Sequence, residues 1–228
     1  TVGVVEREGL GGTCVLWGCI PAKALLEAAS IAQKVAKGAE FGVKAEKVTL
    51  DYGVAMKRSR SVSAQNSKGV EFLFKKNKIT WLKGTGALGA GKTVKVTDAD
   101  GKSETHTATK AVVIATGSRV KGLPQIGLEI NKTTVISSDE ALTLEKTPGS
   151  IAVIGAGAVG CEFADVFNSF GSKVTLLEVM PRLLPIEDED CSAELGKAFK
   201  KRGIAVMTGA KLGTAKVTKS GVTIPVEA

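Results

Sequence analysis

A glycine-rich turn between an apolar strand and a helix is the feature that most limits how this sequence can fold. Residues 150–154 form an apolar β-type run, Gly155-Ala-Gly157-Ala-Val-Gly160 follows, and residues 161–170 have helical periodicity. In such a turn the first glycine permits a tight bend, the second lets the backbone approach a pyrophosphate, and the third allows close helix–strand packing. The pattern therefore predicts an α/β unit that binds a dinucleotide.

An acidic residue ends the next predicted strand. Residues 173–177 are a second apolar run, and Glu178 follows it, 18 residues after Gly160. A carboxylate at this position accepts hydrogen bonds from a ribose 2′-hydroxyl and repels a 2′-phosphate. We therefore expect this turn to bind NAD rather than NADP.

Two cysteines frame another glycine-containing segment near the start of the chain. Cys14 and Cys19 stand directly ahead of a predicted helix over residues 20–37. The first turn of that helix contains Pro21 and Lys23. Unpaired N–H groups at a helix N-terminus and a nearby lysine both stabilise a thiolate. The spacing favours a reversible redox disulfide, and a structural bridge or two unconnected core cysteines are the alternatives.

The residues around these cysteines resemble a known family. The run GGTC, four intervening residues and then CIPAK is similar to the redox-active segment of the FAD-dependent pyridine nucleotide-disulfide oxidoreductases, and the likeness extends along nearly the whole chain. The chain departs from the family's usual residues at Leu16 and Trp17 inside the loop and at Ala22 before the lysine. These departures concern loop packing and redox potential rather than the class of chemistry.

The resemblance implies an α/β fold with two Rossmann-like dinucleotide-binding domains. Residues 1–145 would form an FAD-binding domain with the redox cysteines and a small antiparallel β-meander, and residues 146–228 an NAD-binding domain. Glu6 ends the first strand, where a nucleotide-binding unit has its ribose-binding acid; a plain polar strand end is the alternative. The matching glycine turn would lie upstream of Thr1, so we expect a fragment that is incomplete at both ends.

The resemblance also implies roles for single residues. Cys14 is the interchange thiol, and Cys19 is the sulfur that contacts the flavin. Lys23 pairs with Glu162 near the contact between flavin and nicotinamide, and a solvated position is the alternative for Glu162. The remaining residues expected to contact FAD or NAD are Glu6, Gly12, Thr13, Thr116, Gly117, Gly155, Gly157, Gly160 and Glu178.

Within the family, the sequence is most similar to the members that oxidise dihydrolipoamide with NAD⁺. This likeness implies the lipoyl domain of a 2-oxo acid dehydrogenase complex as partner and a homodimer for the full-length protein. The family's histidine base belongs to a C-terminal interface domain with no counterpart here, so we expect the chain alone to be inactive. An NADPH-dependent mercuric or glutathione-type reductase and a non-catalytic dinucleotide-binding fragment are the alternatives.

Composition argues against other classes of function. The net charge of +8 comes from scattered lysines, and 4% of residues are aromatic, so we expect no nucleic-acid surface. The sequence contains no uninterrupted apolar run of about 18 residues, so we expect no membrane span. Four cysteines in 228 residues suit a reducing cytoplasm, with a mitochondrial matrix or plastid as alternatives. Two cysteines and the lone His106 fall short of a zinc site, so no metal is expected.

The other periodicities predict the remaining elements. Helices are expected after Asp51 as far as residue 76 with interruptions, near residues 139–144 and over residues 187–201. The meander is expected at residues 79–81, 93–97 and 104–108, and a buried strand at residues 111–115. Residues 57–60 are expected to be a solvated helix face.

Overall fold

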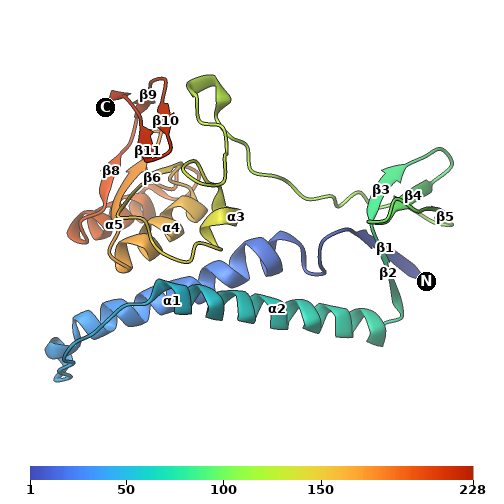
Figure 1. Cartoon of the computed structure of the whole chain (residues 1–228), viewed down its shortest axis with the longest axis horizontal. Coiled ribbons are helices and arrows are strands. Elements are labelled where there is room, and N and C mark those ends of the chain that lie inside the picture. The colour runs from blue at the N-terminus through green and yellow to red at the C-terminus, as the bar shows by residue number, and fades with distance from the viewer. Residues whose placement is uncertain (228) are drawn as a thin grey trace. The chain divides into compact units, whose positions relative to one another are not determined.

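The computed structural model describes residues 1–227 (Figure 1). Contacts divide the chain into two compact units, Thr1–Ile20 with Ser61–Arg119 and Pro21–Arg60 with Val120–Ala228. This division differs from the cofactor domains suggested by the sequence, because the helices α1 (Cys19–Ala36) and α2 (Tyr52–Lys76) each cross a unit boundary. The division into domains 1–145 and 146–228 stays a prediction.

The first unit contains two small sheets. Strand β1 (Val2–Glu6) pairs in parallel with β2 (Ile79–Lys83). The antiparallel meander consists of β3 (Thr85–Leu88), β4 (Thr93–Thr97) and β5 (Ser103–Thr107). The sequence reasoning was therefore wrong to put residues 79–81 in the meander, because the chain bends at Gly84, with φ of 157°, and a separate strand follows.

Residues 111–115 do not form the predicted buried strand. The segment has no strand assignment, and the side chains of Val113 and Ile114 are 83% and 68% exposed. An apolar run becomes a buried strand only where a neighbouring strand satisfies its backbone groups and another layer covers it. Within residues 1–227, no strand pairs with this run.

The two long helices begin close to where the sequence predicts. The side chain of Asp51 accepts a hydrogen bond from the N–H of Val54 at 3.1 Å, so Asp51 acts as the N-terminal cap of α2. Helix α2 continues to Lys76 without the expected interruptions. Residues 57–60 are a solvated face only in part, because Ser59 is fully buried and donates a hydrogen bond to the carbonyl of Pro21 at 2.9 Å.

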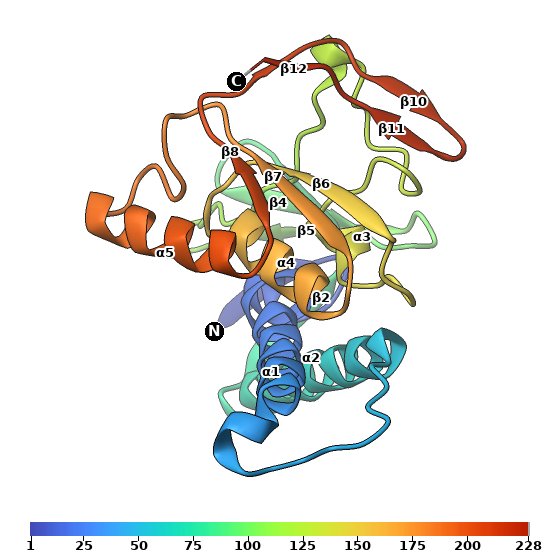
Figure 2. The ribbon, with the colours of Figure 1, turned by 90° about the vertical axis from the view of Figure 1, so that its left-hand side faces the viewer.

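The second unit is built on a parallel sheet with the order β6-β7-β8. Strand β6 (Ser150–Ile154) leads through α4 (Ala158–Ser169) to β7 (Lys173–Leu177), and α5 (Glu189–Lys201) leads on to β8 (Ala205–Met207). Two right-handed crossovers in the same direction place both helices on one face of the sheet, where Figure 2 shows α4 and α5.

One apolar core holds the second unit together. Leu25 and Ala29 of α1 are fully buried in this core, as is Leu176 of β7. Aromatic side chains fill its centre, where the ring of Tyr52 meets that of Phe170 edge-on at 5.2 Å between centroids. Burial raises the pKa of Tyr52 to about 12, and its hydroxyl donates to the carbonyl of Ala141.

The stretch Thr13–Ala36 is long and apolar enough to cross a membrane by length and composition. The core helix of a soluble domain meets the same criterion, and Leu25 and Ala29 lie in the core of the second unit. Residues of α1 also form polar contacts, through Lys23 and Gln33, with side chains of α4. The most apolar 18 residues of the stretch are 28% buried, so packing covers only part of its apolar surface.

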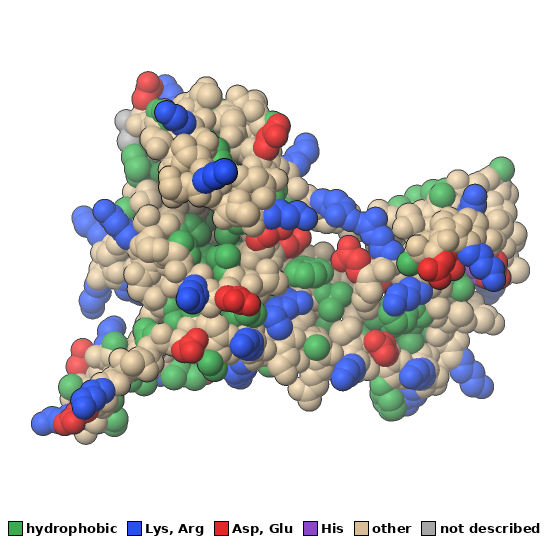
Figure 3. Space-filling model, viewed as in Figure 1, with side chains coloured by type: hydrophobic (Ala, Val, Ile, Leu, Met, Phe, Trp, Pro, Cys, Tyr) green, Lys and Arg blue, Asp and Glu red, His purple; other side chains and the backbone are tan. Residues whose placement is uncertain are grey.

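Short elements complete the fold. The single-turn helices are η1 (Thr13–Trp17), η2 (Gly38–Phe41), η3 (Pro124–Ile126) and α3 (Ser138–Ala141). The terminal strands are β9 (Lys211–Leu212), β10 (Lys216–Thr218), β11 (Gly221–Thr223) and β12 (Val226–Glu227). Lysine and arginine side chains are spread over the face drawn in Figure 3 and do not gather into one patch.

Candidate functional site

The glycine turn of the second unit has the geometry that its sequence predicts. Gly155 has φ of 98°, and its N–H donates to the carbonyl of Leu177 at 2.8 Å. A Cβ on Gly160 would lie 1.9 Å from the carbonyl oxygen of Gly155, so only glycine lets the helix pass this close. A Cβ on Gly157 would meet nothing within 4 Å, which leaves the turn open to a ligand.

Helix α4 begins at this turn with free anion-binding capacity. Gly157 is its N-terminal cap residue and has no side chain to bond the first N–H groups of the helix. These N–H groups and the helix dipole favour a negatively charged ligand such as a pyrophosphate. The residues of the turn therefore fit the diphosphate of a dinucleotide.

Glu178 lies at the carboxyl end of β7 and is 7% exposed. One carboxylate oxygen accepts from the N–H of Ala156 at 2.7 Å, and the other accepts from the N–H of Met180 at 2.8 Å. The carboxylate is thus fixed against the glycine turn. Each oxygen has two lone pairs, so Glu178 can still accept hydrogen bonds from a ribose.

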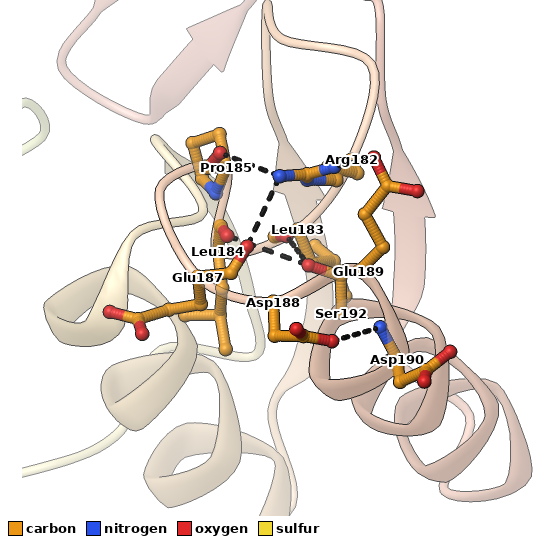
Figure 4. A network of polar contacts seen from close by, with 9 residues as sticks. All are labelled: Arg182, Leu183, Leu184, Pro185, Glu187, Asp188, Glu189, Asp190 and Ser192. Carbon is orange, nitrogen blue, oxygen red and sulfur yellow. Dashed lines mark hydrogen bonds and ion pairs between the residues drawn. The ribbon is translucent and has the colours of Figure 1, made fainter.

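The loop between β7 and α5 also contacts the glycine turn. The N–H of Leu184 donates to the carbonyl of Ala156 at 2.8 Å, with Leu184 in the left-handed region at φ of 45°. Contacts of Arg182 stabilise this loop, because its guanidinium binds backbone carbonyls of the loop and the side chain of Glu189 (Figure 4). The hydroxyl of Ser192 donates to the carbonyl of Leu183 at 2.5 Å. The sequence reasoning missed this support, since backbone contacts leave no residue pattern.

Lys23 and Glu162 form an ion pair within the second unit, as the family resemblance implies. Lys23 comes from the first turns of α1, and Glu162 from α4, two residues after Gly160. The lysine side chain is 61% exposed and that of the glutamate 26%. Glu162 is thus a partly exposed helix residue that pairs with Lys23, and the role of the pair in the chemistry stays a prediction.

A buried thiol lies directly behind the glycine turn. Cys161 is 7% exposed, and its sulfur lies 3.4 Å from the carbonyl oxygen of Ala156. Burial, with smaller contributions from Glu178 and Glu162, raises the pKa of the Cys161 thiol to about 11. Cys161 is therefore protonated at neutral pH and packs as a small apolar residue.

The cysteine loop belongs to the first unit. Cys14 lies in the π-helical turn η1, and Cys19 is the first residue of α1. Both cysteines are exposed. Gly12 has φ of 61° and Gly11 φ of 127°, where a Cβ would lie 2.5 Å from Val15. Glycine is thus required for the chain to enter this turn, and the redox disulfide itself stays a prediction.

Serines of α2 fix the backbone of the cysteine loop. Ser63 is fully buried and donates to the carbonyl of Val15 at 2.6 Å, and Ser67 donates to that of Leu10 at 2.6 Å. These serines were not predicted as part of the site. Their signal was available, because serines at residues 59, 63 and 67 repeat at the four-residue spacing of one helix face.

The other predicted FAD contacts lie in the first unit and are not buried. Glu6, at the end of β1, accepts a hydrogen bond from the N–H of Glu8 at 2.8 Å. Thr116 and Gly117 belong to the extended segment after residue 111, with Gly117 at φ of 72°. Gly12 and Thr13 enter the π-turn with exposed side-chain positions. Their roles toward FAD stay predictions.

Two further observations concern polar groups elsewhere. His106 lies on β5, with Nε2 3.7 Å from a carboxylate oxygen of Glu104. Among residues 1–227, no group of three or more histidine, cysteine or acidic residues could hold a metal ion.

Arg202, after α5, pairs with Asp165 of α4 and donates to the hydroxyl of Ser169 at 2.9 Å. This last contact ties α5 to α4.

Comparison with known proteins identifies the family of the chain. Residues 1–227 match the model of the pyridine nucleotide-disulphide oxidoreductase family. The chain is 44% identical over 219 residues to a dihydrolipoyl dehydrogenase from Chlorobaculum parvum, covering 96% of the chain and 46% of that protein. It is 39% identical over 232 residues to dihydrolipoyl dehydrogenase from Bacillus subtilis, covering 99% and 48%. The chain thus spans about half the length of the curated relatives it matches.

Solved structures show the same α/β fold. The crystal structure of LpdA from Mycobacterium tuberculosis matches with a TM-score of 0.89 at 23% identity, over 99% of this chain and 49% of that one. The HOCl-induced flavoprotein disulfide reductase RclA from Escherichia coli matches with a TM-score of 0.81 at 24% identity, over 99% and 47%.

Proposed function

Because the chain belongs to the pyridine nucleotide-disulphide oxidoreductase family, we propose that it carries the dithiol and the nicotinamide-binding turn of a dihydrolipoyl dehydrogenase. The observation that supports this most is the exposed cysteine pair around the π-turn at the start of α1. The glycine turn with Glu178 supports the second half of the proposal. Two Rossmann-like domains, one for FAD and one for NAD, are the architecture we propose for the complete protein.

The cysteine pair would exchange with a dihydrolipoyl dithiol. A lipoyl thiolate attacks Sγ of Cys14 in the oxidised pair, the bond to Cys19 breaks, and Cys19 leaves as a thiolate. The second lipoyl thiol loses its proton to solvent and, as a thiolate, attacks the lipoyl sulfur of the mixed disulfide, which closes the lipoamide ring and releases Cys14 as a thiolate. The dithiol then holds the two electrons that the substrate has lost. Exposure of both cysteines permits the attack.

FAD, when bound, supplies the chemistry that thiols lack, since it accepts an electron pair from a dithiol and passes it on as hydride to NAD⁺. In this chain Glu6, Gly12, Thr13, Thr116 and Gly117 are the residues proposed to hold FAD. Lys23, which pairs with Glu162, is proposed from the family resemblance to interact with the flavin.

The second glycine turn is proposed to hold NAD. N–H groups at the start of α4 bind the pyrophosphate, and Gly157 leaves room for it. The buried carboxylate of Glu178 accepts hydrogen bonds from the ribose hydroxyls. The proposed partners of the complete protein are a lipoyl domain of a 2-oxo acid dehydrogenase complex and a second copy of the chain, and the proposed location is the cytoplasm.

A thiol-exchange experiment tests the proposed function. The oxidised chain is mixed with dihydrolipoamide, and protein thiols are counted by mass after alkylation. We expect two new thiols at Cys14 and Cys19, and none in Cys14→Ser or Cys19→Ser. Cys191→Ser is the matched control, because Cys191 is also exposed but lies on α5. No exchange in the unmodified chain would refute the proposal.

A further inference from the structure

An open cavity of about 950 Å³ lies within the second unit, next to the loop that follows β7 and Glu178. It is lined by the loop after β7, by the side of α5 and by the end of β8, with Arg182, Glu189, Lys200 and Thr208 among its residues. The carbonyl of Met180, whose N–H binds Glu178, accepts from the N–H of Gly209 at 2.8 Å. The lining of the cavity begins at Pro181, three residues after the acid proposed to bind the ribose.

Arg182 is the one basic residue between β7 and α5 in the sequence. An arginine in this loop is the usual partner of the 2′-phosphate in proteins that bind NADP. Here the guanidinium is already engaged. One terminal nitrogen donates to the carbonyls of Pro185 at 3.2 Å and Glu187 at 3.1 Å, and the other pairs with the carboxylate of Glu189 (Figure 4).

We propose that Glu189 is a specificity-determining residue, which excludes a 2′-phosphorylated dinucleotide by neutralising Arg182. The inference rests on the proposed function, because it assumes that the glycine turn binds NAD. The carboxylate of Glu178 repels a 2′-phosphate directly. Glu189 acts in addition, because its ion pair with Arg182 neutralises the guanidinium that could otherwise bind the phosphate.

The geometry explains why Glu189 rather than the other groups of the cavity has this effect. The two backbone carbonyls orient the guanidinium without neutralising it, so only the carboxylate of Glu189 cancels its charge. Lys200 also lines the cavity, but it lies eleven residues further along α5, about 16 Å at 1.5 Å per residue. The Arg182 side chain is 34% exposed and that of Glu189 83%, so the pair can be opened without unfolding the loop.

Calorimetric titration with NAD⁺ and with NADP⁺, without turnover, tests the proposal. The two probes differ only in the 2′-phosphate, and the measured quantity is the ratio of their dissociation constants. We expect Glu189→Gln to shift this ratio about fivefold to tenfold toward NADP⁺, because the guanidinium then keeps an uncompensated positive charge in the loop that follows Glu178. The double variant Arg182→Ala with Glu189→Gln is expected to restore the original ratio.

Glu187→Gln is the matched control. It removes one negative charge from the same loop, but only the backbone carbonyl of Glu187 contacts Arg182, so its ratio should stay within about twofold of the unmodified chain. An unchanged ratio in Glu189→Gln overturns the proposal, as does a shift that persists in the double variant or appears equally in the control. Failure of the unmodified chain to bind NAD⁺ overturns the proposed function itself, and the present inference with it.

Discussion

Residues 150–154 and 111–115 are both apolar five-residue runs that lead to a glycine, yet they adopt different structures. Residues 150–154 form β6, which pairs in parallel with β7 along its whole length. Residues 111–115 pair with no strand of residues 1–227 and expose Val113 and Ile114 to solvent. The comparison shows that apolar composition specifies a capacity for a buried strand, and that a hydrogen-bonded neighbour decides whether the strand forms.

The neighbouring strand also determines how the glycine after each run behaves. Gly155 follows β6 and is tied to Leu177, the last residue of β7. Gly117 follows the unpaired run, and a Cβ on it would meet nothing within 4 Å. A strand partner therefore fixes the start of a ligand-binding turn, as well as the strand itself.

The largest expected effect is on the free energy of unfolding, when one side chain is truncated at the paired run and one at the exposed run. Leu176 is fully buried on β7 opposite Val153, so Leu176→Ala removes packing atoms and leaves a cavity. We expect a loss of about 3 to 4 kcal/mol in the free energy of unfolding, measured by urea denaturation. Ile114→Ala, the matched control in the exposed run, should change it by less than about 0.5 kcal/mol. Equal effects would show that the two runs are packed alike.

The second prediction separates two glycines of the same turn. Gly160→Ala puts a Cβ against the backbone of Gly155 and should cost about 2 to 3 kcal/mol of stability, measured by thermal unfolding. Gly157→Ala meets no atom and has φ of −70°, so we expect it to leave the melting temperature nearly unchanged while weakening NAD⁺ binding. A stable Gly160→Ala variant would contradict the close approach of α4 to β6.

The third prediction concerns pH and the buried thiol behind this turn. The folded state raises the pKa of Cys161 to about 11, so it favours the protonated thiol. Its contribution to stability is complete below the unfolded pKa of about 8.5 and is lost as pH rises toward 11. Between pH 8 and 10 the unmodified chain should therefore lose about 2 kcal/mol more stability than Cys161→Ala, by urea denaturation at each pH. Parallel curves would place Cys161 in a solvated site.

Local patterns of the sequence were sufficient to predict most of the second unit. The strand, turn and helix around Gly155 and Gly160 are confirmed, because each step depends on residues adjacent in the chain. The family likeness correctly paired Lys23 with Glu162 across 139 positions of sequence. The α/β fold is likewise confirmed by the solved structures.

The predictions that failed depend on contacts distant in the chain. Parallel pairing of β2 with β1 cannot be read from residues 79–83 alone, since the same alternation suits an antiparallel strand. The four-residue spacing of the serines marks one face of α2, but it does not identify the carbonyl that Ser63 bonds, which lies 48 residues away. Backbone carbonyls are present at every residue, so the hold of Arg182 on its own loop leaves no distinctive pattern either.

The most direct test of the account is a redox titration of the cysteine pair. The chain is equilibrated in thiol buffers of defined potential, and the state of Cys14 and Cys19 is read by alkylation and mass measurement. We predict one reversible two-electron transition between them at roughly −200 to −300 mV, the range of thiol-exchange enzymes. If Cys14 and Cys19 form no disulfide at any potential in that range, the central claim is contradicted.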